Sequence, residues 1–180
     1  MTPTPTDLLP AARWEELERE VAERFGLSAS VTDNQGARVT TFDNFCNDLC
    51  RRIKTDPKGL TAICALAGQY FAGEVASSGG PVMEECDAGM TKIAVPIYVG
   101  GSRGGNAGGN ARGEVAGNVG GCGVLVDDGE PDDFMIAKSL GVDEAELAGC
   151  MATVPRITRA RAEEIRAWLE ERVARMLAEG

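Results

Sequence analysis

Apolar residues recur at helical spacing near both ends of the chain. Over residues 10–26 the apolar positions lie three or four residues apart, at Trp14, Leu17, Val21 and Phe25. Residues 156–180 show the same spacing, at Ile165, Trp168, Leu169, Val173, Met176 and Leu177. Each pattern predicts an amphipathic helix. We expect the two apolar faces to cover a sheet of the same chain or each other, and pairing across a homodimer is the alternative.

Between these helices the pattern predicts an α+β domain. Residues 27–33 and 37–41, separated by turn residues, predict a short antiparallel hairpin. Residues 43–54 predict a helix capped by Asp43 or Asn44, and Asp56-Pro57 opens a second helix over residues 56–76. Residues 82–86, 93–99 and 115–126 predict strands, and residues 132–140 and 143–151 predict short helices.

The chain of 180 residues fits one domain that extends over residues 1–180. Residues 1–9 are polar and proline-rich and predict a flexible start, and residues 27–151 predict the core. Residues 100–113 are dominated by glycine and asparagine and contain no apolar side chain larger than alanine. Such a segment buries too little surface to offset its ordering entropy, so it predicts a flexible loop.

Charge and composition exclude several classes of function. The net charge of -10 and the pI of about 4.6 disfavour binding to nucleic acid or to an anionic membrane, because both require clustered Lys and Arg. No apolar run reaches the roughly 18 residues of a membrane span, so we expect a cytoplasmic protein. The absence of histidine rules out a serine triad or a histidine phosphorelay, and we expect no enzyme.

The cysteines carry the candidate chemistry, because five of the six lie between Cys46 and Cys122. In a reducing cytoplasm they are expected to be free thiols, metal ligands or redox groups. Cys46 and Cys50 are four residues apart on a predicted helix, so both thiols are expected on one face. Zinc sites usually bring ligands in close pairs, and only this one pair occurs, which favours an iron–sulfur cluster over zinc. Cys150, beside Met151, is expected in the core.

Several motifs around these cysteines resemble the PocR-type sensory domain over about residues 15–150. They are residues 44–46 (Asn-Phe-Cys), Cys64, residues 85–90 (Glu-Cys-Asp-Ala-Gly-Met), residues 95–100 (Val-Pro-Ile-Tyr-Val-Gly) and residues 117–123 (Gly-Asn-Val-Gly-Gly-Cys-Gly). The resemblance implies a PAS-like antiparallel sheet with helices around a ligand pocket, in a signalling protein that binds small organic molecules. Cys46, Cys64 and Cys86 match cysteine positions of the family, whereas Cys50 and Cys122 suggest a cysteine-richer subgroup.

We therefore expect a sensory domain with a cysteine-bound cofactor. Cys46, Cys50, Cys64 and Cys86 are the expected ligands of an iron–sulfur cluster of the [4Fe-4S] type, with Cys122 as a further candidate; zinc or no metal is the alternative. A redox or small-molecule signal at this site would shift the terminal helices and reach a separate signalling protein.

Two alternatives use the same segments without a metal. In the first, a receptor for a small organic metabolite has an apolar pocket lined by Phe45, Ile63, Met90, Ile93, Ile97 and Val124. In the second, Cys86 and Cys122 lie on adjacent strands and close a disulfide under oxidant. The sequence leaves both open.

Overall fold

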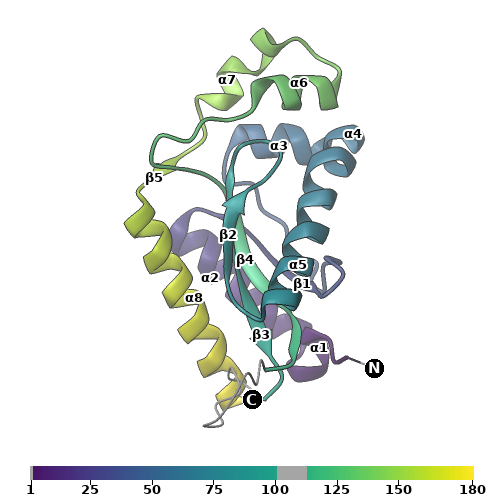
Figure 1. Ribbon diagram of the computed structural model, residues 1–180, viewed down its shortest axis with the longest axis vertical. Coiled ribbons are helices and arrows are strands. Elements are labelled where there is room, and N and C mark those ends of the chain that lie inside the picture. Colours follow the sequence, from purple (N-terminus) through teal and green to yellow (C-terminus); the bar gives the residue numbers. More distant parts are fainter. Residues whose placement is uncertain (1, 101–112) are drawn as a thin grey trace.

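The computed structural model of the protein describes residues 2–100 and 113–180, which are arranged around an open antiparallel sheet. The strand order is β1 (Ser28–Asp33), β4 (Val115–Val126), β3 (Thr91–Tyr98), β2 (Val82–Glu85). A short strand, β5 (Arg156–Ile157), pairs in parallel with the end of β4. Helices cover both faces of the sheet (Figure 1). This is the α+β, PAS-like fold that the sequence predicts.

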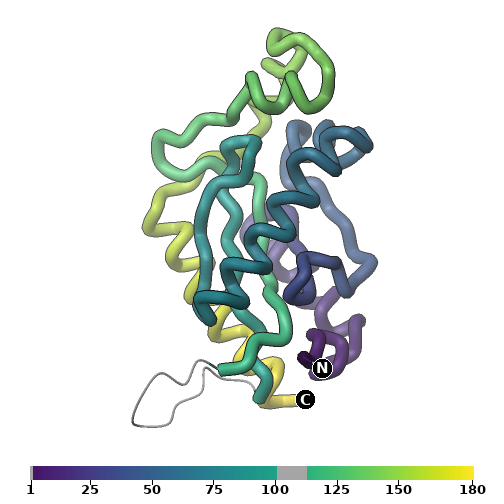
Figure 2. Tube along the Cα trace, turned by 45° about the vertical axis from the view of Figure 1, so that its right-hand side comes forward, coloured from purple at the N-terminus to yellow at the C-terminus, as the bar shows by residue number. Residues whose placement is uncertain are grey.

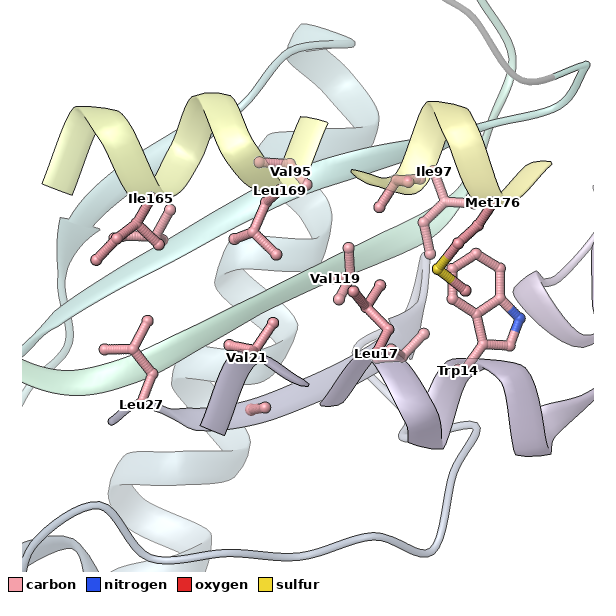
Figure 3. Packing of buried hydrophobic residues seen from close by; sticks show 14 of the residues in the cluster. Trp14, Leu17, Val21, Leu27, Val95, Ile97, Val119, Ile165, Leu169 and Met176 are labelled. Carbon is pink, nitrogen blue, oxygen red and sulfur yellow. The ribbon is translucent and has the colours of Figure 1, made fainter. Parts of the chain in front are cut away.

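One face of the sheet is covered by the two long terminal helices, α2 (Ala11–Phe25) and α8 (Arg159–Glu179). Their apolar stripes meet over the sheet, as Figure 3 shows, in a cluster that includes Trp14, Leu17, Val21, Val95, Ile97, Val119, Ile165, Leu169 and Met176. Phe25 and Trp168 add an edge-to-face ring contact at 5.0 Å. Both stripes are thus buried within one chain, as expected, and a homodimer remains a prediction that this packing does not require.

The other face of the sheet is covered by α5 (Leu66–Ser78), which is preceded in the chain by α3 (Asp48–Thr55), α4 (Pro57–Gly59) and η1 (Leu60–Ala65). Figures 1 and 2 show α5 and α8 on opposite sides of the strands. Successive side chains of a strand point to opposite faces. Ile93, Val95 and Ile97 therefore join the core beneath α2 and α8, whereas Lys92 faces α5 and stands over the ring of Phe71.

A small helical layer closes one end of the molecule. It consists of α6 (Asp133–Leu140), η2 (Glu144–Leu147) and α7 (Ala148–Met151), which pack against α3 and α4. Leu49, Ile53, Ile136, Leu140 and Leu147 are buried at this junction. The start of the chain and the end of α8 lie at the opposite end (Figures 1 and 2). The predicted helix over residues 132–140 is confirmed within a residue, whereas residues 143–151, predicted as one helix, form the 3-10 turn η2 followed by α7.

The structure departs from the sequence prediction near the N-terminus. Residues 1–9 are predicted to be flexible, yet residues Pro5–Leu8 form α1, capped by Thr4 and Asp7. The Pro5 carbonyl oxygen accepts a hydrogen bond of 2.9 Å from the buried Trp14 indole. This contact attaches the first turn to α2, because an indole N–H that is buried needs an acceptor.

The predicted hairpin and the start of the next helix also differ. Residues 37–41 form no strand; a single bridge joins Thr32 to Arg38, and β1 pairs along its whole length with β4. The segment is instead held by α2, since Glu18 accepts hydrogen bonds from Arg38 and Thr40. Helix α3 begins after an Asn47 cap and not at residue 43 or 44. Most of the predicted loop over residues 100–113 lies outside the described residues.

Candidate functional site

A cavity of about 340 Å³ lies between the sheet and the helices α3, η1 and α5. That volume falls in the range of small-molecule sites, about 300–1,000 Å³. Its apolar walls include Ile53, Leu60, Ile63, Ala67 and Met90. Four of the five cysteines that the sequence singles out line it, namely Cys50, Cys64, Cys86 and Cys122. The chain thus brings thiols from four separate segments around one space.

An irregularity in the sheet directs Cys122 into this cavity. The pairing of β3 with β4 shifts between Thr91, opposite Val124, and Lys92, opposite Cys122, so Gly123 is an extra residue. Such a bulge changes which face of the sheet the following residues point to. Cys122 therefore faces the cavity, whereas Val124 packs in the core beneath α2 and α8.

Two other cysteines are positioned by local departures from regular structure. Cys64 lies in η1, a π-helical turn within the long helical stretch, and such turns are frequent at functional sites. Cys86 follows β2 at a tight turn, in which its N–H donates to the Met90 carbonyl at 2.9 Å and the Gly89 N–H donates to its carbonyl at 2.8 Å. Both thiols are partly buried beside the cavity.

Cys46 and Cys50 form a hydrogen-bonded pair, although not in the predicted way. Cys46 precedes the Asn47 cap and is not helical, so the two thiols do not share one helix face. The Cys46 sulfur nevertheless accepts hydrogen bonds from Ser28 Oγ and from Asn47 Nδ2, both at 3.2 Å. The Cys50 thiol is a further hydrogen-bond partner of the Cys46 sulfur, and it also lies 3.7 Å from the Met90 sulfur. The capping geometry, and not the spacing of four, brings the pair together.

The thiols differ in acidity because their surroundings differ. The hydrogen bond from Cys50 lowers the pKa of Cys46, with Ser28 adding to the effect, and the same bond together with burial raises the pKa of Cys50. Burial raises the pKa of Cys64 to about 12 and that of Cys122 to about 11. Burial also raises the pKa of Cys86. Cys46 is therefore the thiol of the set whose surroundings most favour the thiolate.

At neutral pH, iodoacetamide is expected to alkylate Cys46 before Cys64 or Cys122. The thiolate is the reactive form, and the lowered pKa of Cys46 makes it abundant at a pH where the two raised thiols are protonated. Mass spectrometry of timed digests measures the order. Replacement Ser28→Ala removes one hydrogen bond to the sulfur and should slow the reaction. Earlier labelling of Cys64 or Cys122 would contradict the assignment.

The predicted apolar pocket is only partly assembled. Ile63 and Met90 line the cavity. Ile93, Ile97 and Val124 lie in the core on the opposite face of the sheet, because of strand alternation and the bulge at Gly123. Phe45 also lies outside the lining and has Arg51 and Lys54 over its ring, at 4.8 and 5.2 Å.

Sequence reasoning missed the basic residues of the cavity. Lys92, Lys54 and Arg38 all line it. Lys92 is 7% exposed, and burial lowers its pKa. Its signal in the sequence was a single charged residue inside the strand Thr91–Tyr98, where the neighbouring positions are otherwise uncharged.

The thiols surround the cavity and do not meet at one point. Within residues 2–100 and 113–180, no group of three or more His, Cys, Asp or Glu side chains is placed to hold a metal ion. All six cysteines are free thiols. The expected adjacency of the strands carrying Cys86 and Cys122 is wrong, because β3 lies between β2 and β4. Cys150 packs beside the apolar cluster at α3 and α6, and it is not among the residues lining the cavity.

Comparisons with known proteins identify one family for this chain. In the part of the chain that the structure describes, no helix has the length and apolar character needed to cross a membrane. Neither the curated proteins nor the solved structures include a match to this chain. The model of the family described as "Sensory domain found in PocR" matches residues 7–109, more than half of the chain, and this range includes all the candidate cysteines except Cys122. The chain belongs to the PocR sensory domain family.

Proposed function

We propose that this protein is a cytoplasmic sensory domain that holds an iron–sulfur cluster in the cavity beneath the sheet. The observation that carries the proposal is the convergence of thiols from four segments on one cavity. Cys64, Cys86 and Cys122 supply three ligands. The fourth comes from the hydrogen-bonded pair Cys46 and Cys50.

The donor set and its arrangement fit a cluster better than a single zinc ion. Tetrahedral zinc requires four ligand atoms within about 2.0–2.3 Å of one point, whereas the thiolates of a cluster bind separate irons and stand further apart. Thiols distributed around a cavity match the second geometry. When bound, such a cluster supplies a reversible redox change and sensitivity to oxidants.

The cavity is connected to the terminal helix α8 through β4. Cys122 and Gly123 lie in this strand, and beyond them Leu125 N–H donates to the Pro155 carbonyl at 2.9 Å. The Asp127 N–H donates to the Ile157 carbonyl, also at 2.9 Å, and the Asp127 carboxylate accepts from the first N–H of α8, that of Arg159, at 2.8 Å. A change in the cavity that moves β4 would therefore move the start of α8, which a separate signalling protein would detect.

Anaerobic reconstitution with ferrous iron and sulfide is expected to give a coloured protein that contains both. Iron, sulfide and zinc assays with a visible spectrum measure this. Cys64→Ser, Cys86→Ser and Cys122→Ser should each lose most of the bound iron, because each removes one ligand. Cys46→Ser and Cys50→Ser should each retain part of it, and the double variant should lose it.

Cys150→Ser is the matched control, since it removes a thiol that does not line the cavity. It should bind as much iron as the wild type. The proposal fails if the reconstituted wild type is colourless and free of iron and sulfide. A stoichiometric zinc content in place of iron would also overturn it.

A further inference from the structure

The lining of the cavity has an unusual charge distribution for this chain. The protein carries 28 acidic residues against 18 basic ones. Among the described residues that line the cavity there is no Asp or Glu, whereas three are basic, namely Arg38, Lys54 and Lys92. The lining of this cavity is therefore basic, although the protein as a whole is acidic.

Two of the three basic residues already have anionic partners. Arg38 pairs with Glu18 at 3.1 Å and with Asp43 at 3.4 Å, and Lys54 Nζ pairs with Asp43 at 2.7 Å. Within residues 2–100 and 113–180, Lys92 forms neither an ion pair nor a hydrogen bond through its Nζ. Its ammonium group lies 5.3 Å from the centre of the Phe71 ring. The titratable groups that act on it are the thiols of Cys122, Cys86 and Cys64, which carry negative charge only as thiolates, and the guanidinium of Arg38.

A buried ammonium group among apolar walls is costly unless an anion neutralises it. Burial lowers the pKa of Lys92 and the lining provides no carboxylate for it, so a negatively charged occupant, or thiolates that the occupant binds, would stabilise its charged form. We propose that the cavity is an anion site whose occupant carries negative charge and is neutralised by Lys92. The inference deepens the proposed function, since a cluster bound by four thiolates is one such anion; a small organic carboxylate is the other source.

Two measurements on Lys92→Met test this inference. The first is iron uptake and the midpoint potential after reconstitution of the full chain. A positive charge near a cluster favours the reduced form, so the variant should bind less iron or show a more negative midpoint potential. Lys138→Met, a change to an exposed lysine of α6 outside the cavity, is the matched control and should match the wild type.

The second measurement separates the two sources of charge. In the cofactor-free protein, butyrate should raise the melting temperature of the wild type, whereas butyramide, of the same shape but neutral, should not. The shift should disappear in Lys92→Met, whose folding is checked by far-ultraviolet circular dichroism. Dependence on Lys92 in either measurement supports the anion site. Dependence of iron uptake or midpoint potential identifies the cluster as the source of negative charge, and dependence of the butyrate effect identifies an organic carboxylate.

The inference is overturned if neither measurement depends on Lys92, or if butyramide stabilises the protein as much as butyrate and cluster uptake is unchanged in the variant. Its failure can be told apart from failure of the proposed function. If the reconstituted wild type contains no iron and sulfide, only the cluster proposal is contradicted. If Lys92→Met has the iron content and midpoint potential of the wild type, and the effect of butyrate does not depend on Lys92, only the anion site is contradicted.

Discussion

Replacement of Gly123 by alanine is expected to weaken binding of the proposed iron–sulfur cluster by about 10- to 100-fold, the range seen when residues that support metal ligands are changed. A Cβ atom at this position would lie 2.1 Å from the Cys46 sulfur and 3.1 Å from the Cys50 sulfur, so both thiols would have to move. The backbone φ of +97° adds strain for any residue with a side chain, worth about 1–3 kcal/mol of stability. Iron and sulfide content after reconstitution measures the first effect, and urea unfolding measures the second.

Gly26→Ala provides the control for backbone strain. Gly26 also has a positive φ, +64°, but no atom lies within 4 Å of the position its Cβ would take. This variant should lose some stability through strain and keep its full iron content. Equal iron content in both variants would show that the contact between Gly123 and the two cysteines does not matter for the site.

Replacement of Trp14 by alanine is expected to cause the largest loss of stability, about 3–5 kcal/mol. Trp14 is 0% exposed, and its side chain packs from α2 into the core shared with α8 and the sheet (Figure 3). The change leaves a cavity in this core. It also leaves the Pro5 carbonyl without the indole donor, which frees α1 from α2. Urea unfolding followed by far-ultraviolet circular dichroism gives the change in the free energy of unfolding.

Trp14→Phe separates the two contributions, because it keeps most of the ring volume while removing the hydrogen bond to Pro5. Its loss of stability should be clearly smaller than that of Trp14→Ala. If the two variants lose the same amount, the contact with α1 and not the packing dominates. A loss below about 1 kcal/mol for the alanine variant would contradict the burial of this side chain in solution.

Local sequence signals were sufficient for most of the elements. The apolar spacing of α2 and α8, the Asp56-Pro57 start of the long helical stretch and the turn at residues 87–89 are all confirmed. Each depends on residues close together in the chain, so the pattern contains the information. The hairpin over residues 27–41 is only partly formed. One edge of β1 pairs with β4, about 90 positions further along the chain, and its other edge meets residues 37–39 at a single bridge and two hydrogen bonds, too few for a second strand. Residues 37–41 instead bond to α2 through Glu15 and Glu18.

The candidate site also combines features that the local sequence determines with features that depend on contacts between distant segments. The sequence alone determined that cysteines are the chain's only strong soft ligands, that five of them cluster between residues 46 and 122, and that Cys150 stands apart. Which face of the sheet each side chain points to was decided by the tertiary structure. The bulge at Gly123 separates Cys122 from Val124, and strand alternation separates Lys92 from Ile93. A shift of one residue reverses the facing of a strand, and such a shift is set by pairing between distant strands, which no local pattern records.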